Sequence, residues 1–356
     1  ARSDWMAIEQ KRGISVTSSV MTFDFGGIRF NLLDTPGHED FSEDTYRTLT
    51  AVDCAVMVID AAKGIEAQTR KLFEVCRLRG IPIITFINKI DREGLSPFAL
   101  LDEIADKLAL DTVPMSWPLG MGGTFRGIYS FEETRAYIVD RVGGALCPDI
   151  LDVSGLGDPK LHAALTNGTH EALVEDAAIA SGAYPDFSKE AFLSGDMTPV
   201  YFGSALKNYG VGSLLSALAQ HAPTPQPQPA FPAPIEPTAS TVSGFIFKMQ
   251  ANMDPNHRDR VAFLRICSGT LHRGMKLENS RTGKKIGLHN PIFFLARDRA
   301  LIEEARPGDI VGIPNHGTLR VGDTLSETGG IAFTGLPDFA PEILRRVRLD
   351  DPMKIK

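Results

Sequence analysis

The sequence predicts an α/β domain with a mostly parallel sheet, followed by a small β-barrel domain. From residue 28 to about 110, short apolar runs alternate with amphipathic segments, which is typical of strands joined by crossover helices. From about residue 241, short strand-like runs alternate with glycine-containing turns at even spacing, as in a small closed barrel. The length of 356 residues also favours two or more domains over a single core.

The apolar runs of the first part predict strands, and the segments between and after them have helical spacing. The expected strands are 28–34, 54–60 and 81–88, and the expected helices are 42–50, 66–79 and 97–108. The strands are nearly continuous in apolar residues, as expected when helices cover both faces of a parallel sheet. Ser96 is the expected N-cap of the last helix, with Pro97 at its first position.

A proline-rich stretch sets the expected domain organisation. So many prolines, within 222–236, cannot continue a helix or a central strand, so 222–240 is expected to be a stiff, extended linker. Residues 1–221 then form the first domain, with an insertion at about 112–196 where the rhythm changes to short strand-like pieces around glycines. Residues 241–356 form the barrel and the start of a connection that leads out of it.

Composition restricts the classes of function. The formal net charge of −7 does not indicate a nucleic-acid binder, although a local basic face can operate on an acidic protein. Four widely scattered cysteines, with no CxxC pair, argue against a zinc site or a disulfide scaffold and favour a reducing cytosol. No apolar stretch approaches the roughly 20 residues of a membrane helix. We therefore expect a cytoplasmic protein without a membrane partner.

Asp34 ends the first expected strand and is followed by a turn that contains Gly37 and His38. Ligands of parallel α/β sheets bind at the carboxyl ends of the strands. There the Asp34 carboxylate can orient a magnesium ion, directly or through water, and the Gly37 N–H can meet a terminal phosphate. His38 is then placed to position an attacking water. The alternative interpretation is a strand-ending turn with a solvated histidine.

The segment NKID, which follows the strand 81–88, contains Asn88, Lys89 and Asp91. An aspartate can accept hydrogen bonds from N1–H and the exocyclic amine of guanine, a donor pair that adenine lacks. Lys89 can lay its stem along the base, and Asn88 can tie the loops together. The alternative is a polar turn that caps the following segment, but the order and strand context favour a guanine site.

A third segment, GSALKNYG, follows another expected strand. Backbone N–H groups of Ser204 and Ala205 can donate to the guanine O6, with Leu206 or Lys207 covering the ring. Taken alone this segment is weak, because Ser-Ala-Leu is common, and its value comes from its order and position.

The magnesium shell needs a hydroxyl that is released when the γ-phosphate leaves, and Ser15 is the first candidate, with Thr17 the second. The alternative for this run of serines and threonines is a flexible loop. A phosphate cradle should read GxxxxGK followed by Ser or Thr. The only GK pair is Gly283–Lys284, followed by Lys285 and lacking the earlier glycine. In a GTPase this P-loop lies before the switch segment, so it is expected upstream of residue 1.

The motifs RGIS, DTPGH, NKID and SAL occur in the order found in the translational GTPases of the ribosome, which this chain resembles. The histidine after DTPG is typical of that group. Within it, the long stretches SDWMAIEQKRGISVTSSV and WPLGMGGTFRGIY are similar to the bacterial class-II peptide chain release factor family, release factor three.

The resemblance implies a P-loop-GTPase-type domain with a family-specific insertion, then a translation-factor-type β-barrel, and a third domain expected beyond residue 356. By the same resemblance His38 is the water-positioning catalytic residue, activated on the ribosome, Asp34 holds magnesium through water, and Ser15 stands where relatives often carry threonine. The implied cofactors are GTP or GDP with Mg2+. The implied partners are the ribosome and class-I release factors, and the protein is expected to be a monomer.

The implied function is GTP-dependent removal of class-I release factors from the ribosome after peptide release in translation termination. A translocase resembling elongation factor G, or a ribosome-protection protein, is the alternative within the same group. A non-hydrolysing ribosome-binding module is the alternative from another class, and the lack of a P-loop motivates it. For the same reason this chain alone is expected to bind nucleotide poorly.

Overall fold

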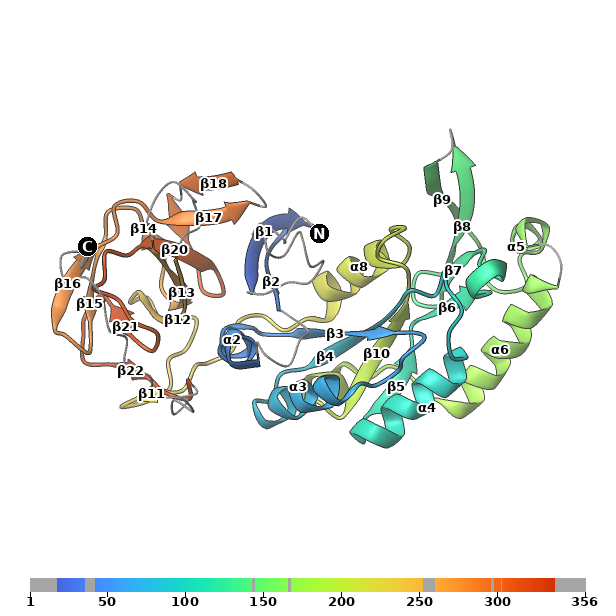
Figure 1. Ribbon diagram of the computed structural model, residues 1–356, viewed down its shortest axis with the longest axis horizontal. Coiled ribbons are helices and arrows are strands. Elements are labelled where there is room, and N and C mark those ends of the chain that lie inside the picture. Colours follow the sequence, from blue (N-terminus) through green and yellow to red (C-terminus); the bar gives the residue numbers. More distant parts are fainter. Residues whose placement is uncertain are drawn as a thin grey trace, which may run out of the picture.

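The structure of the 356-residue chain is a computed structural model (Figure 1). The residues that it describes are 18–35, 42–142, 145–165, 168–251, 260–295, 298–301 and 303–336, and of 42, 140–148, 251 and 293–301 it describes the backbone at most. No helix within these ranges is long and apolar enough to cross a membrane.

The centre of the first domain is a four-stranded parallel sheet with the strand order β3-β4-β10-β5. Its strands are β3 (Ala55–Asp60), β4 (Ile83–Asn88), β10 (Met197–Phe202) and β5 (Asp111–Pro114). The helices around it are α2 (Ser42–Thr48), α3 (Ala67–Leu78), α4 (Pro97–Leu108) and α8 (Val211–His221), and α2 continues into the 3-10 turn Leu49–Ala51.

Helices cover both faces of this sheet, as its continuous apolar strands predict. Along β4, Ile83 and Ile87 pack into the cluster that contains the apolar side chains of α3 and α4. The alternate residues Ile84 and Phe86 pack into a second cluster with Ala217 of α8. Figure 1 shows α8 on one face of the sheet and α3 and α4 on the other. The predicted α/β fold class is confirmed.

The predicted elements of the first domain all form. The N-cap of α4 is also confirmed, because the Ser96 hydroxyl oxygen accepts a hydrogen bond from the Ala99 N–H at 3.2 Å. One prediction about their arrangement is wrong: β2 (Ile28–Asp34) does not lie in the parallel sheet. It pairs antiparallel with β1 (Ser19–Phe25) along its whole length, and the pair forms a separate two-stranded sheet.

The physical reason for this arrangement lies in the apolar side chains of the β1–β2 hairpin. Val20 and Leu33 pack in one cluster with phenylalanines of the second domain rather than beside β3. The Asn31 amide also donates to a carboxylate oxygen of Asp309 at 3.2 Å. The hairpin therefore lies against the second domain, next to β17, as Figure 1 shows.

Between β5 and β10 the chain leaves the parallel sheet. A four-stranded antiparallel sheet comes first, and helices follow it. Its strands are β6 (Ser116–Leu119), β7 (Gly127–Ser130), β8 (Arg135–Val142) and β9 (Ala145–Asp152), with the 3-10 turn Gly122–Thr124, and the helices are α5 (Pro159–Ala164), α6 (Thr169–Ala183) and α7 (Lys189–Ser194). β5 belongs to the parallel sheet, so the segment that departs from this sheet begins at β6.

The second domain is a curled antiparallel sheet with the strand order β16-β15-β21-β12-β13-β20-β17-β18. The strands are β12 (Ser243–Ala251), β13 (Arg260–Ser268), β15 (Lys276–Asn279), β16 (Lys284–Gly287), β17 (Ile292–Leu295), β18 (Asp298–Leu301), β20 (Ile310–Pro314) and β21 (Thr324–Ser326). A short pair, β14 (Leu271–His272) with β19 (Glu304–Ala305), lies beside it.

The proline-rich linker contains no helix over 222–240, as predicted. It does contain a short strand, β11 (Ala230–Phe231), which pairs antiparallel with β22 (Ala332–Phe333) near the end of the described chain. The linker is therefore attached to the second domain by backbone hydrogen bonds, in addition to being extended.

Two buried, positively charged side chains of the second domain form hydrogen bonds with the first domain. Arg265 of β13, only 2% exposed, donates to the Ala51 carbonyl and to an Asp53 carboxylate oxygen, both at 2.6 Å. Lys248 of β12 donates to the Ser18 carbonyl and, at 2.8 Å, to an Asp44 carboxylate oxygen. Burial alone raises the pKa of the Asp44 carboxyl, but the Lys248 ammonium and the Ser18 donors outweigh it and lower the pKa.

Replacing the buried guanidinium tests the strength of this contact. Arg265→Ala leaves the Asp53 carboxylate and the Ala51 carbonyl without their partner, so we expect the free energy of unfolding to fall by about 3 kcal/mol or more. The control, Arg306→Ala, removes an exposed pair with Glu304 and is expected to cost about 0–1 kcal/mol. Urea titrations of both variants measure the difference, and equal losses would contradict the assignment.

Candidate functional site

The parallel pairing of β4 with β10 places their carboxyl ends at the same edge of the sheet. Thr85 is opposite Val200 and Ile87 is opposite Phe202, so the two strands end within one residue of each other. The loop that begins at Asn88 and the loop that begins at Gly203 therefore start side by side. These loops contain the NKID and SAL motifs.

The Asn88 side chain joins the two loops, as predicted. Its carbonyl oxygen accepts a hydrogen bond from the Lys89 N–H at 2.8 Å and another from the Ala205 N–H at 2.9 Å. The backbones bond to each other as well, because the Gly203 N–H donates to the Ile87 carbonyl at 2.8 Å. Because the Asn88 side chain is short and its oxygen accepts from both loops, it holds the NKID and SAL loops close together.

Lys89 extends this arrangement to the end of β3. Its backbone has φ of 69°, an uncommon conformation for a residue with a side chain. Its ammonium donates to an Asp60 carboxylate oxygen at 2.6 Å. Burial raises the pKa of the Asp60 carboxyl, but the Lys89 ammonium and the Ala62 N–H, which both donate to it, outweigh burial and lower the pKa. The ends of three neighbouring strands are therefore linked by side chains.

Asp91 is held as a buried, ionised carboxylate. Its side chain is 7% exposed, and the Lys207 ammonium lies 3.1 Å from one of its oxygens. Burial raises the pKa of this carboxyl, but the neighbouring Ser204 hydroxyl and the Lys207 ammonium outweigh it and lower the pKa. An ionised carboxylate is the acceptor that the two guanine donors require, so the residues present fit a guanine base.

Two predicted donors to the guanine O6 are engaged within the chain. The Ser204 N–H donates to the Tyr209 carbonyl at 3.0 Å, closing the loop on itself, and the Ala205 N–H donates to Asn88. Both N–H groups thus have acceptors within the chain, and their donation to a guanine O6 stays a prediction. Leu206, the next residue, is 84% exposed, whereas Lys207 pairs with Asp91 instead of covering a ring.

Gly203 contributes to the site and was not singled out from the sequence. A Cβ atom at this position would lie 2.4 Å from Cζ of Phe86 and 2.5 Å from the Tyr209 carbonyl oxygen. Only glycine therefore allows the loop 204–209 to pack this closely against β4. The sequence signal was present, because this glycine directly follows an apolar strand and precedes Ser-Ala-Leu.

The predicted phosphate side of the site is described only in part. Ser15, Thr17, Gly37 and His38 lie outside the described residues. Asp34 is described, but it ends β2 on the antiparallel hairpin, opposite Ser19, and not a strand of the parallel sheet. The structure thus brings together Asn88, Lys89, Asp91 and the SAL loop 204–206, and it places Asp34 on another sheet. The roles of all these residues toward a nucleotide stay predictions.

Two models of known protein families match this chain. A family model described as the elongation factor Tu GTP binding domain matches residues 1–224, which is more than half of the chain. The chain belongs to this family. A second family model, elongation factor G domain 2, matches residues 241–328, the region of the curled antiparallel sheet. The combination is that of a translation-factor GTPase, and a guanine nucleotide is the ligand that the name of the first family implies.

The fold of nearly this whole chain is similar to that of a solved structure. A crystal structure of a protein from Thermus thermophilus superposes with a TM-score of 0.70 at 23% sequence identity. The match covers 95% of this chain but 49% of the other. The chain thus spans about half the length of that protein.

A glycine substitution tests the close packing of the SAL loop. Gly203→Ala forces a Cβ into contact with Phe86 and Tyr209, so we expect a loss of about 1–3 kcal/mol in the free energy of unfolding. Gly212→Ala is the control, because it lies in α8 with no atom within 4 Å of the added Cβ. It is expected to be neutral or to stabilise by up to about 1 kcal/mol. Thermal unfolding measures both, and a tolerated Gly203→Ala would show that the loop is not held.

Proposed function

We propose that the complete protein is a ribosome-dependent GTPase that promotes the dissociation of class-I release factors after peptide release. The observation that carries the GTPase part is the joined pair of loops that holds an ionised Asp91 at the sheet edge. Membership of the elongation factor Tu family and the elongation factor G domain 2 match support a role in translation. The termination step rests on the resemblance of the long stretches to release factor three.

The proposed roles divide the site into a base side and a phosphate side. Asn88 and Lys89 hold the loops around the base, and Asp91 accepts from its N1–H and exocyclic amine, with Ser204, Ala205 and Leu206 completing that side. His38 positions the attacking water and Gly37 meets the γ-phosphate. Asp34 and Ser15 are the proposed magnesium ligands, with magnesium supplying charge neutralisation when bound. In the described structure Asp34 lies on the hairpin, so this role requires the hairpin end to face the nucleotide.

Replacing one carboxylate oxygen of Asp91 by an NH2 group tests base recognition in the complete protein. Asp91→Asn cannot accept from both guanine donors, so the affinity for GTP is expected to fall by about a hundredfold or more. Xanthine carries a carbonyl in place of the exocyclic amine, so the same variant is expected to gain affinity for xanthosine triphosphate. Competition against a fluorescent guanine nucleotide measures both constants.

The control for this test is Asp106→Asn, which also replaces a carboxylate by an amide, but on the exposed surface of α4. It is expected to leave both affinities unchanged. If Asp91→Asn leaves the ratio of the GTP and xanthosine triphosphate affinities unchanged, Asp91 does not read the base.

The release-factor role is tested on ribosomes that carry a labelled class-I release factor after peptide release. The complete protein with GTP is expected to accelerate departure of the factor and to hydrolyse GTP in a ribosome-stimulated reaction. His38→Ala is expected to lower the hydrolysis rate by about 10²–10⁴-fold, since it removes the group that positions water. Departure at an unchanged rate with GTP would contradict the proposal.

The match to elongation factor G domain 2 favours one second candidate, a translocase. Movement of messenger RNA and transfer RNA through the ribosome, measured with the same preparation, separates the two. Translocation without factor release selects the second candidate. GTP binding with no hydrolysis on any ribosomal complex selects a non-hydrolysing binding module instead.

A further inference from the structure

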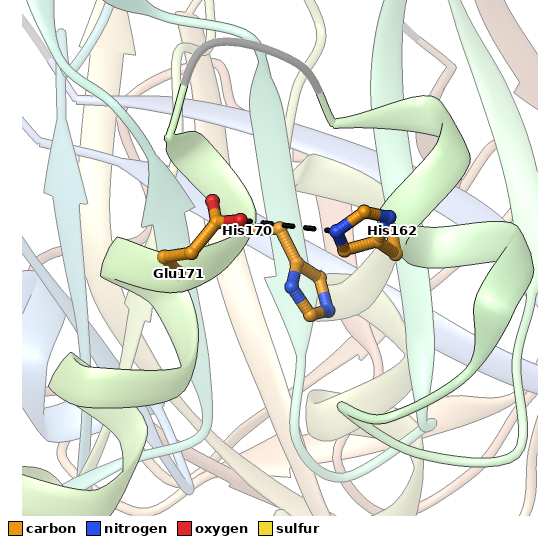
Figure 2. Close-up of side chains that lie close together, drawn as sticks. All are labelled: His162, His170 and Glu171. Atoms are coloured by element: carbon orange, nitrogen blue, oxygen red, sulfur yellow. Dashed lines mark ion pairs between the residues drawn. The ribbon is translucent and has the colours of Figure 1, made fainter.

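A cluster of two histidines and a glutamate lies between two helices of the segment that departs from the parallel sheet. His162 is on α5, and His170 and Glu171 are on the first turn of α6 (Figure 2). One ligand atom from each of the three side chains lies within 4.8 Å of the other two. We propose that His162, His170 and Glu171 form a binding site for a divalent transition metal, of which zinc is the probe, that links α5 to α6.

The distances are close to those that a metal ion requires. The Nε2 atom of His162 lies 3.8 Å from Oε1 of Glu171, the contact drawn in Figure 2. Zinc bonds of about 2.0–2.2 Å in a tetrahedron place neighbouring ligand atoms about 3.3 Å apart. Small changes in side-chain torsions therefore bring the three atoms onto one ion. The two imidazole centroids lie 4.9 Å apart with their planes at 74°, so the rings meet edge to face and not as a stack.

One ring already has its tautomer fixed. Nε2 of His170 lies 2.8 Å from the Leu156 carbonyl oxygen. A carbonyl only accepts, so Nε2 carries the hydrogen, and Nδ1 of the neutral ring is left with its lone pair. Metal-binding histidines commonly donate their other N–H to a backbone carbonyl, which orients the ring and raises its basicity.

The backbone around the cluster is anchored on both sides. Leu161 of α5 and Leu173 of α6 are buried in the main core cluster. Asp158 caps α5 and also accepts from the Ser154 N–H at 2.8 Å, which fixes the turn that contains Leu156. The ligand-bearing turns are thus positioned by packing and capping that do not depend on the cluster itself.

A simple ion pair does not account for the arrangement as well. The His162 and Glu171 side chains are 66% and 68% exposed, and exposed pairs contribute little. A second imidazole beside the pair adds nothing to an ion pair, but it supplies a nitrogen ligand to a metal. Two imidazoles with one carboxylate suit zinc, copper or nickel, whereas magnesium and calcium prefer oxygen ligands. With three protein ligands, water takes the remaining position.

The cysteine spacing that argues against a zinc site in the sequence says nothing about histidine ligands. His162 and His170 are eight residues apart, on two different helices, so no single helical spacing joins them. The three side chains meet where α5 and the start of α6 lie close together in the fold.

Equilibrium dialysis of the metal-free chain against zinc chloride, without nucleotide or phosphate, tests the proposal. The wild-type chain is expected to bind one zinc ion through this cluster. His162→Gln, His170→Gln and Glu171→Gln are each expected to weaken zinc binding at least about tenfold. Glutamine at 170 retains an N–H donor for the Leu156 carbonyl, so this variant removes the ligand while keeping the structural hydrogen bond. His316→Gln, on the exposed surface of the second domain, is the control and should bind zinc like the wild type.

A second measurement distinguishes a built site from loose binding to surface histidines. Cobalt substituted for zinc is expected to give the visible absorption of a low-symmetry nitrogen and oxygen site in the wild type and the control. Zinc is also expected to raise the melting temperature of these two proteins but not of the three cluster variants. Equal zinc binding by the wild type and the cluster variants, or no binding by the wild type, would overturn the proposal.

Discussion

The parallel pairing of β4 with β10 is the constraint on which the candidate site depends. Parallel strands end at the same edge, so the NKID and SAL loops, more than a hundred residues apart in the chain, begin side by side. A single acceptor, Oδ1 of Asn88, can then bond to both loops. The buried Thr85–Thr198 hydroxyl pair, 2.9 Å apart, lies within the same two strands and satisfies two polar groups that would otherwise be costly there. The juxtaposition of the NKID and SAL loops is thus a consequence of strand register.

The second domain is attached to the first at the residues that border the predicted phosphate side. Ser18 directly follows the segment that contains Ser15, and Asp44 follows the segment that contains His38. Both bond to the ammonium of Lys248, which lies on β12 of the second domain and is 4% exposed. A displacement of either segment therefore acts on the same buried cation, and breaking its ion pair with Asp44 costs free energy because the Lys248 ammonium is buried.

Local sequence patterns predicted the elements well, because caps and apolar periodicity act over a few residues. The N-cap Ser96 and the continuous apolar run of β4 are examples. The membership of β2 was predicted wrongly, because the apolar pattern of IRFNLLD is compatible with any sheet that covers it. What decides its place is long-range: Leu33 packs with residues of the second domain, and Asn31 bonds to Asp309, 278 residues away. Neither contact leaves a trace in the local pattern.

The same distinction explains what could be predicted of the site. The order of NKID and SAL sufficed to predict that Asn88 links the two loops, since residue type and strand order determine that bond. The order of the motifs did not suffice to predict the ion-pair partners of Lys89 and Lys207. A long lysine side chain can reach any of several carboxylates, and the folded structure pairs Lys89 with Asp60 and Lys207 with Asp91. The N–H of Ala205 is a further case: Asn88 and a guanine O6 compete for one donor. If Ala205 donates to the guanine O6 as proposed, the base either displaces the Asn88 contact or recruits another N–H of this loop, so the bond that joins the loops and the bond to the base share one donor.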